Sequence, residues 1–400
     1  MKPVSPDRWQ LPAGIREVLP AEAAHMERLR RTIIDLFNVW GYELVVTPMI
    51  EYLESLLTGT GPDLDLRTFK LIDQLTGRSM GIRADMTPQV ARIDAHHLKR
   101  EGAARLCYLG TVLHTVPDGY STSRTPMQVG AELYGHSGPE SDCEILCLML
   151  ETLEAVGIDD VHIDLGHMGI FRGLAVHAGL SEDDEATLFD ALQRKARTEV
   201  EELLFGVGVN ADLCRQICSL VELNGSHDVI PRARTLLAGA GSEVLDALDR
   251  LDSIQTSLHD LRPELKLHFD LSELRGYRYE RGVVFAAYVP GHGDEVARGG
   301  RYDGIGEVFG RERPAIGFST DLQTLASAAG ANGGVFVERI LAPAHDDAAL
   351  RQEIVKLRSA GRVVVQAFPG EAGDSSAQSC THELVLDGIQ WVIKERQAAR

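Results

Sequence analysis

The sequence predicts an α+β protein in which helices pack on one side of an antiparallel sheet. Strand-like segments come in pairs joined by hairpin loops and lie apart from helical segments, whereas residues 181–262 carry leucines and alanines at helical spacing throughout. A glycine-containing linker, Gly330–Gly334, precedes a short run of alternating strands and helices. We therefore predict a core of residues 1–180 and 263–325, a helical insertion of residues 181–262, and a small α/β domain of residues 333–400.

The first elements of the chain are a helix and a strand. Residues 23–40 place apolar side chains at helical spacing, and Gly41 is a natural end for this helix. Residues 42–47 then read as a strand, which Pro48 ends. In the insertion, Ser181 is a good N-cap for the first helix, and sixteen acidic against eight basic residues give this segment a net charge of −8.

Further strands are predicted from runs of β-branched and aromatic residues bounded by turn residues. In the core these strands cover residues 69–72, 79–83, 106–115, 128–134, 163–165, 266–271, 283–289 and 315–319. In the C-terminal domain, strands at residues 339–342, 363–367 and 384–386 accompany a helix at residues 348–360. A cap over a sheet edge and a docking module are equally consistent with this small domain.

Length and charge limit the classes of function. At roughly 150 residues per domain, the 400 residues correspond to two or three domains. Fifty-nine acidic and 40 basic residues give a net charge of −19, and such a surface repels the phosphates of nucleic acids. No apolar run approaches about 18 residues and the first residues lack an apolar signal segment, so we expect a cytoplasmic protein without a membrane span.

Neither a metal nor a cofactor is expected. The six cysteines include no C-x-x-C pair, and four of them form two i,i+4 pairs that fit buried, reduced thiols on helices. His96 and His97 are adjacent on a helical segment, where they point about 100° apart and cannot share one metal ion. The glycine-rich phosphate loop, the dinucleotide-binding loop and the H-E-x-x-H and G-x-S-x-G motifs are also missing from the sequence.

Several glycine-punctuated segments follow one known family in the same order. They are residues 11–20, 81–92, 127–135, 274–279, 298–304 and 314–318. Through them the chain resembles the core of histidyl-tRNA synthetases, class II aminoacyl-tRNA synthetases, over roughly residues 10–325. The resemblance implies the class II fold, an antiparallel sheet flanked by helices. It also implies a self-dimer through the first class II motif, the helix and strand that end at Thr47 and Pro48.

The ATP half of the synthetase site departs from the family. The family holds ATP with an Arg, with a Glu two residues later, and with a second Arg in its third motif; the resemblance puts His114, Val116 and Thr324 at these positions. A guanidinium holds phosphate with a planar fork of donors that these side chains cannot reproduce, and one lost clamp costs about 3–4 kcal/mol of transition-state stabilisation. We therefore expect no catalytic residue. The alternative is a site that still works through Arg83 or Arg124.

The amino-acid half of the site is better preserved. The resemblance implies that seven residues bind histidine: Asp85, Thr87, Gln128, Glu132, Arg275, Tyr279 and Tyr302. Carboxylates suit an α-ammonium group and an imidazole N–H, an Arg suits a carboxylate, and tyrosines enclose a flat ring. The family usually has Glu where this chain has Asp85, and its Gly-Leu-Asp-Tyr-Tyr is changed here at residues 276–280. The alternative is that these polar residues only satisfy one another.

A synthetase-like fold without ATP clamps resembles the regulatory subunits of ATP phosphoribosyltransferase. That family implies a hetero-oligomer with a short-form catalytic subunit, a non-catalytic role in the first step of histidine biosynthesis, and feedback inhibition by L-histidine as effector. One alternative is a divergent ATP-dependent ligase that activates an amino acid. Another is a sensor of uncharged tRNA. Only 75 residues follow residue 325 and the sequence offers no basic groove, so we do not expect nucleic acid as a partner.

Overall fold

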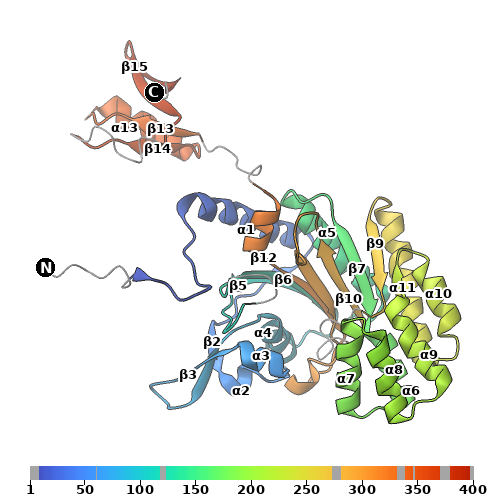
Figure 1. Ribbon diagram of the computed structural model, residues 1–400. Coiled ribbons are helices and arrows are strands. Elements are labelled where there is room, and N and C mark those ends of the chain that lie inside the picture. The colour runs from blue at the N-terminus through green and yellow to red at the C-terminus, as the bar shows by residue number, and fades with distance from the viewer. Residues whose placement is uncertain are drawn as a thin grey trace. The chain divides into compact units, whose positions relative to one another are not determined.

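A computed structural model describes residues 9–59, 61–117, 123–272, 281–330, 338–345, 347–369 and 379–396. The chain divides into two compact units, Met1–Gly333 and Gly334–Arg400. Within the described residues, the first unit contains a nine-stranded and a three-stranded sheet, and the second contains a four-stranded sheet (Figure 1). The boundary between core and insertion stays a prediction, because both lie in the first unit.

The nine-stranded sheet is mainly antiparallel. Its order is β1-β5-β6-β12-β11-β10-β7-β9-β8, and of its pairs only β1–β5 and β7–β9 are parallel. Its strands are β1 (Glu43–Leu44), β5 (Ala104–Thr111), β6 (Met127–Tyr134), β7 (His162–His167), β8 (Asn224–Gly225), β9 (Lys266–Asp270), β10 (Val283–Tyr288), β11 (Ala297–Arg301) and β12 (Ala315–Asp321). The predicted fold class is confirmed, and β12 pairs with β6 although the two are far apart in the sequence.

Four helices pack on one face of this sheet and share a buried cluster with it. They are α1 (Pro20–Val39), α5 (Pro139–Ala155), α6 (Met168–Ala178) and α11 (Ser242–Leu261). Ile33 of α1, Leu146 of α5 and Leu133 of β6 are all members of the cluster. Because successive residues of a strand point to opposite faces, Glu132 and Tyr134 point away from this helical layer.

Two predicted strands are too long. In place of residues 42–47, β1 covers only Glu43–Leu44, because Thr47 leaves the sheet edge and accepts hydrogen bonds from the Arg83 guanidinium on its carbonyl and its hydroxyl. In place of residues 106–115, β5 ends at Thr111, because the next residues no longer pair with β6 and Leu113 N–H donates to the Arg83 carbonyl. Both corrections arise where the chain turns toward the same arginine.

The insertion is helical with one exception. Its helices are α7 (Glu182–Gln193), α8 (Arg197–Val207), α9 (Ala211–Ser219), the 3-10 turn Leu220–Glu222, α10 (Val229–Leu236) and α11. The predicted cap is confirmed, since Ser181 Oγ accepts from Asp184 N–H at 3.2 Å. The prediction of helix throughout is wrong at β8, which pairs antiparallel with β9 because the edge of β9 offers free backbone groups.

The three-stranded sheet has one apolar face that is partly open to solvent. It has the order β2-β4-β3, with β2 at Ile50–Tyr52, β3 at Phe69–Ile72 and β4 at Ser79–Ile82. The register puts six apolar residues on one face, none of them buried: Ile50, Tyr52, Phe69, Leu71, Met80 and Ile82. The helix α2 (Leu53–Leu56) packs near Gly81, which belongs to the other face.

Short helices complete the first unit. They are α3 (Pro62–Arg67), α4 (Thr87–Arg92), a π-helical turn (Ile93–Leu98), a 3-10 turn (Glu307–Phe309) and α12 (Leu322–Ala328). Among the described helices, none combines the length and the apolar run that a membrane crossing requires. The i,i+4 cysteine pairs lie on α5 and α9, as predicted, and the six cysteines are free thiols.

The second unit is a four-stranded sheet with one helix against it. Its order is β14-β13-β15-β16, with β13 at Arg339–Ala342, β14 at Val363–Gln366, β15 at His382–Asp387 and β16 at Gln390–Glu395. The helix α13 (Ala348–Ser359) buries Leu350 and Ile354 in one cluster with Ile340 of β13. Sequence reasoning missed β16, which a tight turn containing Gly388, at φ +64°, joins to β15.

Adjacent residues of α13 provide a test of this packing. Ile354 is 3% exposed and Val355 is 62% exposed. Ile354→Ala should destabilise the second unit by about 2–5 kcal/mol through lost burial and a cavity, whereas Val355→Ala should change its stability by less than about 0.5 kcal/mol. Hydrogen exchange of β13 and β14, measured in the full chain, should rise for the first variant alone. Equal exchange in the two variants would contradict the packing.

Candidate functional site

The best-defined polar cluster surrounds Glu132. This residue lies on β6, on the same face as Gln128, and is 1% exposed. Its Oε1 accepts hydrogen bonds from the Tyr108 hydroxyl at 3.0 Å and from Thr87 Oγ1 at 3.1 Å, and its Oε2 accepts one from the Tyr302 hydroxyl. Three hydroxyl donors from three separate parts of the chain thus meet at one buried carboxyl group.

A second carboxylate joins this cluster through Gln128. Asp85 Oδ1 accepts from Gln128 Nε2 at 2.8 Å and from Thr87 N–H at 3.0 Å, while Gln128 Oε1 accepts from Met86 N–H at 2.9 Å. These bonds fasten the turn before α4 to β6. The turn therefore holds Thr87 where its hydroxyl reaches Glu132.

The electrostatics of the cluster favour a proton or a cation. Burial raises the pKa of Glu132 to about 8, although the hydroxyl donors Tyr302 and Tyr108 act in the opposite direction, and the negative charge of Asp85 raises this pKa further. In the described part of the chain, no Arg, Lys or His forms an ion pair with Glu132. The carboxyl group can therefore hold a proton, or accept the N–H of a cationic ligand.

Two glycines leave the space that these side chains need. Gly130 pairs with Tyr108 across β5 and β6, and Gly317 pairs with Glu132 across β6 and β12. A Cβ atom at residue 130 would collide with the Tyr108 hydroxyl, and one at residue 317 would collide with the Glu132 carboxylate. Glycine at these two positions is thus a condition for the cluster.

Of the seven residues predicted to bind histidine, five lie in this cluster: Asp85, Thr87, Gln128, Glu132 and Tyr302. Arg275 and Tyr279 lie outside the described residues. The sequence reasoning did not include two members, Tyr108 and Tyr134; the Tyr134 ring meets Tyr302 edge to face, with centroids 6.5 Å apart. Tyr134 lies two residues after Glu132 on the same strand, and this spacing could have indicated that both point to one face. Tyr108 could be identified only from the register between β5 and β6.

The three positions aligned with ATP-binding residues make other contacts. The buried His114 places Nε2 2.8 Å from the Ala84 carbonyl oxygen, and Val116 is 55% exposed. Thr324 Oγ1 donates to Asp321 Oδ2 at 3.1 Å, at the start of α12. His114 and Thr324 therefore form hydrogen bonds within the chain, and the apolar side chain of Val116 cannot form one.

The two arginines considered as substitutes also bind within the chain. Arg83 is 7% exposed and donates to the Thr111 carbonyl at 2.9 Å as well as to Thr47. Arg124 donates to the carbonyls of His114, at 2.9 Å, and Ala13, at 3.1 Å. Burial lowers the pKa of Arg83. Backbone carbonyls thus occupy several donors of both guanidinium groups.

Comparison with known proteins identifies the family to which this chain belongs. The sequence pattern of the family described as histidyl-tRNA synthetase matches residues 14–325, and that of the ATP phosphoribosyltransferase subunit HisZ C-terminal domain matches residues 337–394. Over 390 residues, 97% of this chain, it is 57% identical to the ATP phosphoribosyltransferase regulatory subunit of Thioalkalivibrio sulfidiphilus, of which 99% is covered. Identity to the subunit of the same name from Methylococcus capsulatus is 54% over 390 residues, again 97% of this chain, with 96% of that protein covered.

The chain belongs to the family of ATP phosphoribosyltransferase regulatory subunits. Solved structures agree with this assignment. The structure titled ATP phosphoribosyltransferase regulatory subunit/histidyl-tRNA synthetase from Bacillus halodurans has a TM-score of 0.82 at 26% identity, covering 94% of this chain and 97% of that one. A histidyl-tRNA synthetase from Nostoc has a TM-score of 0.77 at 21% identity, covers 94% of this chain and 91% of its own, and shares the fold. The resemblance inferred from the sequence is confirmed.

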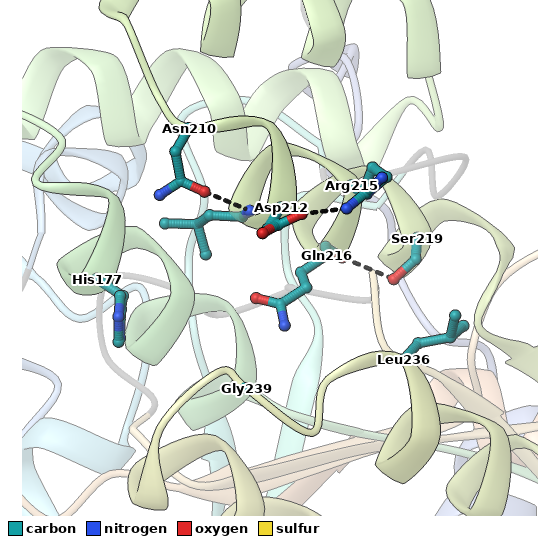
Figure 2. A pocket seen from close by; sticks show the side chains of 9 residues that line it. His177, Asn210, Asp212, Arg215, Gln216, Ser219, Leu236 and Gly239 are labelled. Carbon is teal, nitrogen blue, oxygen red and sulfur yellow. Dashed lines mark hydrogen bonds and ion pairs between the residues drawn. The ribbon is translucent and has the colours of Figure 1, made fainter.

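A separate, open cavity of about 490 Å³ lies between the insertion and α6. Its lining comes from α6, α9, Leu236 at the end of α10 and the loop that follows, and it contains none of the seven predicted residues. Figure 2 shows Asp212 and Arg215 paired with each other, while His177 and Gln216 also line the cavity. Because the polar side chains that line it are all partly or fully exposed, this cavity is a weaker candidate than the Glu132 cluster.

Metal binding finds no support in the described ranges, where no group of three His, Cys, Asp or Glu residues could hold an ion. His96 and His97 lie in the π-helical turn and are exposed. His167 serves as the N-cap of α6, since its Nδ1 accepts from Gly169 N–H at 3.1 Å. These histidines have structural or surface positions.

The raised pKa of Glu132 predicts a pH dependence of stability. The folded chain keeps the proton up to about pH 8, whereas the ordinary value is 4.5, so the unfolded chain binds fewer protons between these pH values. Glu132 should therefore contribute a slope by which unfolding becomes easier as pH rises from 5 to 8, by at most about 1.4 kcal/mol per pH unit for one proton. Glu132→Gln should remove this slope, which urea titrations at several pH values can measure. The exposed Glu202 on α8 supplies the control, and an equal loss of slope in Glu202→Gln would contradict the assignment.

Proposed function

We propose that this chain is the non-catalytic regulatory subunit of an ATP phosphoribosyltransferase and binds L-histidine at the Glu132 cluster. In this role it acts with a short-form catalytic subunit in the first step of histidine biosynthesis, in the cytoplasm, and conveys feedback inhibition. Family membership supports the role, and the buried carboxyl group surrounded by hydroxyl donors is the observation that carries the histidine site. The free cysteines fit a reducing compartment.

The chemistry of the cluster suits histidine. Free histidine presents an α-ammonium group, an α-carboxylate and an imidazole ring with N–H donors. Glu132 and Asp85 can accept from the two nitrogen-bearing groups, and the rings of Tyr302 and Tyr134 offer flat aromatic surfaces. Because Glu132 lacks an ion-pair partner among the described residues, a ligand that supplies an N–H and a positive charge gains more there than a neutral one.

The absence of catalysis is supported by the ATP positions. Amino-acid activation builds charge on phosphates, which class II enzymes hold with arginines, and the aligned residues His114, Val116 and Thr324 offer no guanidinium. Bonds of Arg83 and Arg124 to backbone carbonyls limit them as replacements. The alternative, a divergent ATP-dependent amino-acid-activating ligase, would need one of these two side chains to abandon its bonds. A regulatory role requires no such change.

A self-dimer through the first class II motif is also part of the proposal. At the edge of the large sheet, Leu44 is 50% exposed and Val46 is 86% exposed. The open face of the three-stranded sheet, around Ile50 and Met80, begins only a few residues further along the chain. Exposed apolar side chains of this kind favour association, and a second copy would bury them by two-fold symmetry.

Histidine binding provides the first test. Calorimetry on the isolated chain, or on its complex with the short-form catalytic subunit, should detect L-histidine. Glu132→Gln should weaken binding at least about tenfold, because the amide oxygen can still accept a hydrogen bond but no longer offers a negative charge to the cationic ligand. Glu202→Gln should bind like the wild type. Histidine-dependent exchange of pyrophosphate into ATP should stay at background.

Three outcomes would contradict parts of this proposal. If neither preparation binds histidine at millimolar concentration, the chain is not the histidine sensor. Pyrophosphate exchange by the purified chain would favour the ligase alternative. Unchanged binding in Glu132→Gln would move the histidine site elsewhere, for example to the interface with the catalytic subunit.

The dimer can be tested by adding charge to its proposed surface. Met80→Glu puts a carboxylate in the middle of the open sheet face and should convert the dimer to a monomer at micromolar concentration in sedimentation velocity experiments. Val355→Glu, on an exposed position of α13, is the matched control and should remain dimeric. A monomeric wild type would exclude a stable self-dimer.

A further inference from the structure

A buried cluster of charges joins the last helix of the insertion to the strand that precedes Tyr302. Asp142 of α5 is fully buried. Its Oδ1 accepts from Arg301 of β11, at 3.0 Å from Nε and 2.5 Å from Nη2, and its Oδ2 accepts from Arg250 Nε of α11. Each carboxylate oxygen therefore holds one guanidinium group, and three elements meet at one residue.

Arg301 has little freedom to move. Its side chain is 6% exposed and also bonds to the Ser141 hydroxyl, at 2.8 Å, and to the His136 carbonyl, at 3.1 Å. Its aliphatic stem lies so close to Gly282 that a Cβ atom there would approach it to 2.9 Å. Asp142 thus fixes a side chain that is confined on its other sides as well.

The next residue in the chain belongs to the proposed histidine site. Tyr302 N–H donates to the Ala315 carbonyl at 2.9 Å, and its hydroxyl donates to Glu132 on the face of the sheet opposite to the helices. Asp303 completes the restraint, since its Oδ1 accepts from Ala315 N–H at 2.9 Å and lies 3.3 Å from Arg301 Nη1. A shift of Arg301 would therefore displace the phenol ring of Tyr302.

We propose that Asp142 and Arg250 are positioning residues for Tyr302, through which the helical insertion sets the affinity of the Glu132 cluster for its amino-acid ligand. The reason lies in the burial of Asp142. Without Arg250, Oδ2 loses its donor where water cannot replace it, and the carboxylate must reorient at the expense of its bonds to Arg301. The inference rests on the proposed function, since histidine serves as the probe.

The neighbouring helix α10 supplies a matched control. Arg234 of α10 pairs with Asp249 and Asp252 of α11, and all three side chains are substantially exposed. Arg250→Met and Arg234→Met each remove one guanidinium bonded to a carboxylate, but only the first reaches Asp142. Exposed pairs contribute little to stability, so the control should leave the site unchanged.

The test is a double-mutant cycle measured by calorimetry with L-histidine on the full chain. Arg250→Met should raise the Kd at least about fivefold, and Arg234→Met less than about twofold. In a Tyr302→Phe background, Arg250→Met should change the Kd less than about twofold, because the hydroxyl through which it acts is absent. Arg250→Lys, which restores one donor to Asp142, should recover most of the affinity. This recovery would show that the loss in Arg250→Met comes from the missing donor and not from misfolding.

Additive effects of the Arg250 and Tyr302 substitutions would overturn the inference, and so would an unchanged Kd in Arg250→Met. Both results presuppose that the wild type binds histidine. A wild type that does not bind it contradicts the proposed function instead, and removes the basis of this inference with it.

Discussion

The burial of the Glu132 carboxyl group is the constraint on which the rest of the site depends. A carboxyl group that is 1% exposed needs donors within the protein, and three hydroxyl groups supply them. Those donors are Thr87, the first residue of α4, Tyr108 of β5 and Tyr302, which directly follows β11, so the cluster forms only if these segments meet. Glycine at residues 130 and 317 is the steric condition for that meeting.

The alternation of strand side chains gives the sheet two different functions. One face carries the apolar cluster shared with α1, α5, α6 and α11, and the other carries the polar cluster of the proposed histidine site. At the end of β11 the two faces are linked by consecutive residues, since Arg301 bonds to the helical layer and Tyr302 to Glu132. A regulatory subunit needs such a link, because ligand binding must favour one arrangement of the complex over another.

Much of the fold could be predicted from local patterns. Apolar spacing predicted α1, Ser181 predicted the start of α7, and the spacing of Gln128 and Glu132 placed both on one face of β6. The errors lie where distant segments decide. The strand at residues 42–47 was predicted too long, because the hydrogen bond from Arg83 holds Thr47 away from the sheet. The two-residue strand β8 was missed, because it is a strand only through its pairing with β9.

By itself, the sequence determined the family, and through the resemblance it predicted the residue types of the proposed site and the lack of guanidinium groups at the aligned ATP positions. These properties depend on which side chains stand at which places along the chain. Only the tertiary structure decided that Tyr108 belongs to the Glu132 cluster, that backbone carbonyls occupy donors of Arg83 and Arg124, and that Arg250 reaches Asp142. Each of these contacts joins side chains or carbonyls through the register of strands and the packing of helices. No local pattern encodes such a contact, because its free energy comes from burial that exists only in the folded chain.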